Sequence, residues 1–204
     1  MIAIVDYQSG NLAAIGNIYK QLKIPHVITR DRDTMNDADK YVLPGVGHFG
    51  QAMSVIRHSG LFDTLSENVL AKGKPLLGIC VGMQLLADAS DESSEPGLGW
   101  IPGRVRKIQP NSQATRLPHM GWNSISLRQD ASGLFDGVDV QQGFYFLHNY
   151  HFVPQSPAHI LATTNYGDAL TCGVSNGKNI FGLQFHPEKS HRNGVTVFRN
   201  FARI

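Results

Sequence analysis

Residues 78–82, with the sequence GICVG, place Cys80 between two glycines at a predicted turn from strand to helix. The apolar run at residues 74–77 is typical of a buried strand, and residues 83–87 predict the first turns of a helix. Such a turn is the thiol form of the nucleophile elbow, where glycine neighbours permit strained backbone angles. The adjacent helix N-terminus would favour the thiolate. Cys80 is therefore a candidate nucleophile, although many buried cysteines only fill space.

The other cysteine, Cys172, lies in a strand-like run without such a turn, and we interpret it as a packing residue. Two thiols do not make a disulfide framework, and neither a CxxC motif nor a Cys/His zinc spacing occurs. His148 and His151 are three residues apart, but strand geometry would place them on opposite faces without a carboxylate cluster. We therefore expect no metal, and the cysteine usage fits a reducing cytoplasm.

A nucleophilic thiol needs a base, and the base needs an orienting group. His186 stands at the end of a predicted strand over residues 180–185, which Pro187 should terminate. Catalytic groups commonly emerge at strand ends in open α/β sheets. Glu188 follows two residues later and could bind the far ring nitrogen of His186. These two residues and Cys80 form a candidate triad, and the alternative is a strand-end histidine with only a local backbone bond.

An oxyanion hole is the third requirement of this chemistry. A predicted strand at residues 41–43 leads into residues 44–47, where glycines let the backbone N–H groups of Val46 and Gly47 turn toward a developing negative charge. The amide of Val81, directly after the nucleophile, can supply a further donor. An ordinary turn is the alternative interpretation. A phosphate loop is rejected because the segment lacks both a Lys-Ser/Thr ending and GxGxxG.

Seven segments carry a family resemblance that covers essentially the whole chain. In chain order they are DYQSGN, LPGVG, GICVGMQLL, GLGWI, PHMGWN, FLHNY and QFHPEKS, at residues 6–11, 43–47, 78–86, 97–101, 118–123, 146–150 and 184–190. With these segments the chain resembles the class I glutamine amidotransferases. Within that family it is similar to the glutaminase subunits of imidazole glycerol phosphate synthase.

The resemblance implies a reaction without a cofactor. Cys80 would attack the side-chain amide of glutamine, and His186 would take the thiol proton and pass one to departing ammonia. Glu188 would orient His186, and water would hydrolyse the glutamyl thioester to glutamate. Glu92 could receive the substrate ammonium. The residues implied to hold glutamine are Gly45, Gly47, Gln84, Glu92, His148, Asn149 and Tyr150.

The resemblance also implies a partner, a (β/α)8-barrel cyclase that forms a heterodimer and makes imidazole glycerol phosphate and AICAR in histidine biosynthesis. Ammonium is a poor nucleophile, so a shielded path for neutral ammonia would benefit the synthase. Bulky aromatic residues are enriched at interface cores, although each is also common in a plain core. The residues implied at the interface or the ammonia path are Asn11, Met120, Trp122, Tyr145 and Lys189.

Three departures from the family pattern leave the triad intact. Gln8 stands where glycine is usual, Asn149 stands where serine is usual, and residues 191–194 follow Ser190 where glycine often comes directly. They keep open a paralogous subunit that supplies ammonia to a surface-sugar amidotransferase. A non-catalytic regulatory domain and a cysteine peptidase of related fold are weaker alternatives, because the triad is intact and the base lies in an HPE segment.

The length of 204 residues suits one domain, residues 1–204, with a sizeable core. Hydrophobic content of 42% and a net charge of +2 are ordinary, and no basic patch suggests nucleic acid. The chain starts directly with a predicted strand and lacks the charged segment of a signal peptide. No apolar run approaches the roughly 20 residues that span a bilayer. We expect a cytoplasmic, soluble protein.

Strands and helices alternate in the first half, which predicts a parallel sheet with helices on both faces. The expected fold is α/β, the single-domain class I glutamine amidotransferase fold, with a mostly parallel central sheet and additional antiparallel strands. Strands are expected at residues 2–5, 26–29, 41–43, 74–77, 105–108, 123–127, 144–147, 160–163, 170–174 and 180–185. Helices are expected at residues 11–22, at 48–71 with a break near Gly60, and at 195–201.

Overall fold

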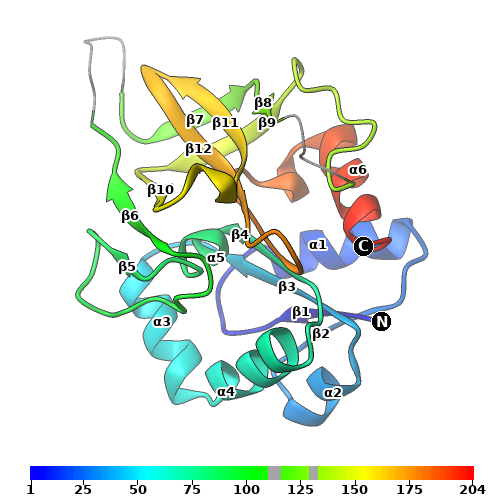
Figure 1. Ribbon diagram of the computed structural model, residues 1–204. Coiled ribbons are helices and arrows are strands. Elements are labelled where there is room, and N and C mark those ends of the chain that lie inside the picture. The colour runs from blue at the N-terminus through cyan, green and yellow to red at the C-terminus, as the bar shows by residue number, and fades with distance from the viewer. Residues whose placement is uncertain (110–115, 129–132) are drawn as a thin grey trace.

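The computed structural model describes residues 1–109, 116–128 and 133–204. In its first half strands and helices alternate, as the sequence predicts (Figure 1). The elements are β1 (Ile2–Val5), α1 (Leu12–Gln21), β2 (His26–Thr29), α2 (Arg32–Asp37), β3 (Lys40–Gly45), α3 (Phe49–His58), α4 (Leu61–Leu65), the π-helix η1 (Ser66–Ala71), β4 (Leu76–Cys80) and α5 (Val81–Gln84).

The second half is richer in strands. It contains β5 (Ala89–Ser90), β6 (Gly103–Lys107), β7 (His119–Asn123), β8 (Ser126–Leu127), β9 (Phe144–His148), β10 (Tyr150–Pro154), η2 (Pro157–His159), β11 (Ile160–Tyr166), β12 (Asp168–Ser175), β13 (Ile180–Leu183), η3 (Pro187–Lys189) and α6 (His191–Phe201).

The described residues form an eight-stranded sheet in the order β2-β1-β3-β4-β13-β12-β11-β8. The strands from β2 to β13 are parallel, and those from β13 to β8 pair antiparallel. The central strands β1 and β4 are apolar and buried along their whole length, as expected for parallel strands covered on both faces. The sheet order reverses between β1 and β3, and ligands bind outside the carboxyl ends of strands at such a point.

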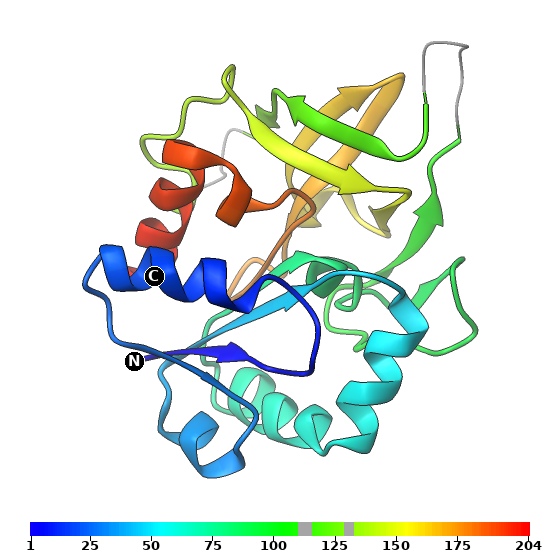
Figure 2. The same cartoon turned by 180° about the vertical axis from the view of Figure 1, so that it is seen from behind.

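Helices cover both faces of the parallel half. α1 and α6 lie together on one face, where the rings of Tyr19 and Phe198 meet edge to face with centroids 5.4 Å apart (Figure 2). α2, α3 and α4 lie on the other face (Figure 1). α1 buries Ile15 and Tyr19, which are four residues apart and so share one side of the helix. The expected α/β fold with antiparallel additions is confirmed.

Two small sheets stand beyond the carboxyl ends of the parallel strands. One has the order β10-β6-β5, and the other is the antiparallel pair β7-β9. In β7-β9, Met120 lies opposite Leu147 and Trp122 lies opposite Tyr145. Figure 1 shows the β7-β9 pair above the end of β4, where it forms a roof over the point at which Cys80 leaves the sheet, and the β10-β6-β5 sheet beside it, with β5 at the level of α5.

Several expected boundaries were wrong. The strand expected at 123–127 is two strands, β7 and β8, which belong to different sheets. The helix expected over 83–87 begins directly after Cys80 and spans only Val81–Gln84. The final helix begins at His191 rather than Val195. The break near Gly60 is confirmed, because Gly60 takes a φ of 75° between α3 and α4. Among the described residues, no helix is long and apolar enough to cross a membrane.

Candidate active site

Cys80 lies at a strained turn, the elbow predicted from its glycine neighbours. It ends β4 with φ 53° and ψ −110°, and α5 begins at the next residue. A Cβ on Gly82 would lie 1.8 Å from the carbonyl oxygen of Leu43, and one on Gly78 would lie 2.6 Å from the carbonyl oxygen of Gly82. The glycines are therefore needed for the close approach of backbone. Such a strained conformation is typical of functional sites.

His186 and Glu188 form a buried pair beside this turn. The Nδ1 of His186 lies 2.9 Å from Oε1 of Glu188, and the two side chains are 4% and 2% exposed. The carboxylate therefore accepts from Nδ1–H, and Nε2 is left for the cavity. The backbone N–H of His186 donates to the carbonyl of Tyr145 at 2.9 Å, which anchors the histidine under β9.

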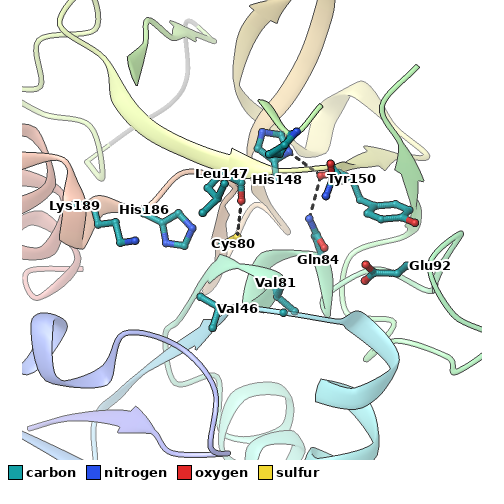
Figure 3. A pocket seen from close by; sticks show the side chains of 13 residues that line it. Val46, Cys80, Val81, Gln84, Glu92, Leu147, His148, Tyr150, His186 and Lys189 are labelled. Carbon is teal, nitrogen blue, oxygen red and sulfur yellow. Dashed lines mark hydrogen bonds between the residues drawn. The ribbon is translucent and has the colours of Figure 1, made fainter. Parts of the chain in front are cut away.

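The imidazole of His186 lies next to the thiol of Cys80 (Figure 3). Burial of His186 disfavours its charged form. Hydrogen bonds to Cys80 and Glu188, together with their negative charges, outweigh burial and raise the pKa of His186 to about 10. At neutral pH the imidazole therefore carries the second proton, which a departing group could take. Two residues that are 106 positions apart in sequence thus meet at one point.

A cavity of about 270 Å³ opens over Cys80. It is large enough for an amino-acid substrate and has both apolar and polar walls. Its lining consists of Val46, Gly47, Cys80, Val81, Gln84, Glu92, Pro118, Leu147, His148, Asn149, Tyr150, His186 and Lys189. Gly45, expected to hold substrate, does not line it. A Cβ there would lie 2.4 Å from the Tyr7 hydroxyl and 2.7 Å from the Gly82 nitrogen, so a glycine at this position lets the backbones approach.

The backbone N–H groups expected to form the oxyanion hole differ in whether they already have a hydrogen-bond partner. Val81 is the first residue of α5, whose opening N–H groups have no partner within the helix. The N–H of Val46 instead donates to Oγ of Ser9 at 3.0 Å, and Ser9 donates back to the Val46 carbonyl at 2.7 Å. Gly47 has a φ of 95°, a conformation that favours glycine. In this structure the Val46 amide is thus bound to Ser9 rather than turned toward the sulfur.

Two polar residues expected to hold substrate also have structural bonds. Oε2 of Glu92 accepts the backbone N–H of Phe49 at 2.7 Å, which holds the start of α3. The second carboxylate oxygen is left for the cavity that Glu92 lines. The Nε2 of Gln84 donates to the carbonyl of Tyr150 at 3.1 Å, so its amide oxygen is the atom left for a ligand (Figure 3). Asn149 is exposed at the cavity mouth.

Among the described residues, no group of three His, Cys, Asp or Glu side chains is placed to hold a metal ion. His148 and His151 lie on different strands, at the end of β9 and within β10. Cys172 is wholly buried in β12, and burial raises the pKa of its thiol, as expected for a packing residue.

Comparison with known proteins decides the family. The model of the class I glutamine amidotransferases matches residues 4–204. The chain belongs to this family. A relative named imidazole glycerol phosphate synthase subunit HisH, from Bdellovibrio bacteriovorus, is 48% identical over 206 residues, covering 100% of both chains. HisH of Leptospira interrogans is 43% identical and HisH 2 of Pseudomonas aeruginosa is 41% identical, again over 100% of both chains. The expected resemblance to this branch of the amidotransferases is confirmed.

Solved structures support the same fold at lower identity. A putative GMP synthase protein from Thermoplasma acidophilum superposes with a TM-score of 0.74 at 20% identity, covering 99% of this chain and 92% of that one. A chain described as glutamine amidotransferase superposes with a TM-score of 0.73 at 19% identity, covering 100% of both. The amidotransferase fold is therefore kept where most of the sequence differs.

Of the residues expected at a partner interface of the amidotransferase, Lys189 lines the cavity, and Met120 lies opposite the lining residue Leu147 in the β7-β9 pair. Met120 and Trp122 of β7 are 63% and 45% exposed. Trp122 stacks on His191, with ring centroids 5.2 Å apart. The ammonium of Lys189 lies 5.6 Å from the centre of the Tyr145 ring. Asn11 precedes α1, and its side chain makes no capping hydrogen bond.

Three polar residues of this amidotransferase site were not predicted from the sequence. Gln184 lies 3.7 Å from the sulfur, His119 bonds His148 at 2.9 Å, and Ser9 holds Val46. Gln184 could have been found, because side chains two residues apart on an extended segment share a face and His186 follows at that spacing. The contacts of His119 and Ser9 cross between distant segments, and no local pattern indicates them.

Proposed function

We propose that this amidotransferase hydrolyses glutamine to glutamate and ammonia at Cys80, as the glutaminase subunit of imidazole glycerol phosphate synthase in histidine biosynthesis. One observation carries the proposal: the thiol of Cys80, on a strained backbone turn, lies beside the buried His186–Glu188 pair at the cavity. The names of the full-length relatives support the pathway.

In the proposed reaction, Cys80 Sγ forms a bond to the side-chain amide carbon of glutamine. The thiol proton lies on His186 Nε2, while Glu188 accepts from Nδ1–H and stabilises the imidazolium. Collapse of the tetrahedral intermediate breaks the C–N bond, and His186 protonates the departing nitrogen, which leaves as ammonia. His186 then takes a proton from water, which attacks the thioester and releases glutamate and the thiol.

We propose that the cavity holds glutamine at its ammonium group and at its side-chain amide. The free carboxylate oxygen of Glu92 would bind the substrate ammonium, and the amide oxygen of Gln84 offers a further acceptor. The N–H of Val81 would donate to the oxyanion. Val46 and Gly47 would complete that site once the Val46 amide exchanges its bond to Ser9 for one to the oxyanion.

We propose a (β/α)8-barrel cyclase as the partner in a heterodimer, bound over the cavity mouth. The support is the group of large apolar side chains exposed there, Val46, Met120, Trp122 and Leu147, of which Val46 and Leu147 also line the cavity. Exposed apolar groups of this kind mark interaction surfaces. Ammonia formed at Cys80 would then leave toward the partner rather than into water. A cytoplasmic location suits this role, because both cysteines are free thiols.

Cys80→Ala tests the nucleophile. In the complex with the cyclase, we expect glutamine-dependent synthesis to fall by at least about 10⁴-fold, because removal of a nucleophile removes the covalent route. Ammonia-dependent synthesis should stay within about twofold of the unsubstituted complex, because the cyclase would perform that step by itself. Both rates are measured by product formation. Glutaminase activity that persists in the variant would reject Cys80 as the nucleophile.

The alternative partner is a surface-sugar amidotransferase, which the departures at Gln8 and Asn149 keep open. Both are exposed positions outside the triad, and Asn149 also lines the cavity. Mixing the protein with each candidate synthase and measuring glutamine-dependent product formation separates the two pathways. A chain that binds a partner but never turns over glutamine with any of them would instead be a regulatory domain.

A further inference from the structure

The carbonyl oxygen of Tyr150 accepts two hydrogen bonds at the edge of the cavity (Figure 3). Gln84 Nε2 lies 3.1 Å from it and His148 Nδ1 lies 2.8 Å from it. Because a carbonyl oxygen can only accept, both nitrogens must carry a hydrogen toward it. This oxygen therefore fixes the amide orientation of Gln84, and it fixes the tautomer of a neutral His148.

Between the Tyr150 carbonyl and the sulfur, the buried side-chain amides of Gln84 and Gln184 form successive hydrogen bonds. The second hydrogen of Gln84 Nε2 points to Gln184 Oε1 at 3.1 Å. With its oxygen held there, Gln184 turns its nitrogen to Cys80, at 3.7 Å from Sγ. Gln84 is 3% exposed and Gln184 is 0% exposed, so water does not compete for these bonds. The sulfur thus has an N–H donor that does not belong to the triad.

On the side away from the sulfur, the direction of hydrogen-bond donation is also fixed at a second histidine, His119. Since Nδ1 of neutral His148 carries the hydrogen, its Nε2 can only accept, and His119 Nδ1 lies 2.9 Å away. His119 must donate there, so its own Nε2 accepts from Asn123 Nδ2 at 3.2 Å. The His119 ring is stacked between Phe146 and Tyr166, with centroids at 4.5 and 4.0 Å.

Both histidines of this hydrogen-bond chain are neutral in the folded protein. Burial lowers the pKa of His148 to about 3 and the pKa of His119 to about 4. A neutral ring has one donor and one acceptor, so each position in the chain admits a single arrangement of hydrogens. A protonated ring would place two donors face to face and break it.

We propose that Gln184 stabilises the sulfur of Cys80 as the thiolate, and that His119 and His148 act through the Tyr150 carbonyl as positioning residues that keep the Gln184 N–H aimed at it. An N–H donor binds an anionic acceptor more strongly than a neutral one, so the bond favours thiolate over thiol. The inference rests on the proposed function only for the use made of the thiolate. The hydrogen-bond polarity that supports it is independent of the substrate.

Other titratable groups also face this thiol, and their effects must be separated from that of Gln184. His186 lies beside the sulfur, and the buried hydroxyl of Tyr7 interacts with it electrostatically. The remaining titratable residues of the cavity wall are Glu92, His148, Tyr150 and Lys189. None of these is altered when Gln184 is replaced by an apolar residue of similar length.

The test measures alkylation of Cys80 by iodoacetamide in the full-length protein, between about pH 5 and pH 10. In Gln184→Met, we expect the midpoint of the rate–pH profile to rise by about one pH unit and the rate near pH 7 to fall about tenfold. Peptide mass spectrometry separates Cys80 from the wholly buried Cys172. A Gln184→Met profile that superposes on the unsubstituted one, in protein with an unchanged far-UV circular dichroism spectrum, overturns the proposal.

Variants of His119 test the part of the hydrogen-bond chain that lies beyond the Tyr150 carbonyl, and they leave the residues that contact the sulfur unchanged. His119→Leu removes the donor to His148, and we expect alkylation about threefold slower near pH 7. His119→Asn keeps an N–H near the Nδ1 position and should restore most of the rate. Tyr166→Phe, which keeps the stacked ring and loses only the hydroxyl, is the matched control and should match the unsubstituted protein.

The outcomes separate this inference from the proposed function. Equal alkylation in both His119 variants and the unsubstituted protein would overturn the roles of His119 and His148. If Gln184→Met and His119→Leu slow alkylation as expected but the protein never hydrolyses glutamine, the proposed function is overturned and the inference stands. Glutamine turnover with no effect of Gln184→Met on alkylation would do the reverse.

Discussion

The two sides of the cavity differ in how their polar groups are held. On the thiol side, Cys80, Gln184 and His186 are 4%, 0% and 3% exposed, and each bonds to other buried groups. On the loop side, Val46 is 48% exposed, and its amide is held by the hydroxyl of Ser9 near the surface. The chemistry-bearing groups are thus fixed by burial, and the oxyanion loop by a solvent-accessible contact.

This difference indicates which side a partner can change. Rearranging the thiol side would leave buried polar groups without partners, at about 1–3 kcal/mol for each group. Releasing the Val46–Ser9 bond costs only the net worth of one hydrogen bond, about 0.5–1.5 kcal/mol. The exposed apolar residues Met120 and Trp122 lie on β7, in the roof over the cavity. We therefore expect a bound partner to change activity by moving the oxyanion loop, while Cys80, Gln184 and His186 keep their positions.

The largest expected effect comes from breaking the thiol side. His186→Ala should lower kcat for glutamine by about 10³- to 10⁴-fold, because the triad acts as a unit. Glu188→Gln keeps the shape but loses the charge, so we expect a smaller loss of about 10- to 100-fold. His159→Ala, whose ring bonds Ser175 away from the cavity, is the control. Rates for both triad variants within twofold of the control would contradict the assignment.

A smaller effect is expected from breaking the proposed partner face. Trp122→Ala should raise the Kd for the cyclase about 30-fold, since aromatic anchors at interfaces contribute about 2 kcal/mol or more. Isothermal titration calorimetry measures this Kd. Leu70→Ala is the matched control, because Leu70 is 52% exposed but lies on η1, which follows α4 at the opposite end of the molecule from β7 (Figure 1). Equal loss of affinity in both variants would place the partner elsewhere.

The smallest effect should come from freeing the loop. Ser9→Ala removes the acceptor of the Val46 N–H, and we expect glutamine turnover by the isolated protein to rise about two- to tenfold. Ser9→Thr keeps the hydroxyl and should stay at the original rate. Ammonia release is measured without the partner. A fall in turnover in Ser9→Ala would mean that Ser9 supports the active conformation, which reverses the comparison of the two sides.

Most of the parallel half of the fold could be predicted from the sequence. Its strands are short apolar runs between helices with one apolar face, so local pattern and burial agree. The strand-rich second half was harder to predict, because β7 and β8 join different sheets within a run that looks like one strand. Strand pairing there depends on partners far along the chain, such as β9 for β7 and β11 for β8.

The sequence by itself determined the elbow at Cys80, because only glycine at 78 and 82 lets the backbones of that turn approach so closely. It also determined the pairing of His186 with Glu188, which are two residues apart. Tertiary structure alone decided that Gln84 and His148 meet at the Tyr150 carbonyl and that Ser9 holds Val46. The physical reason is that hydrogen-bond direction between distant segments depends on which acceptor each buried donor meets after folding.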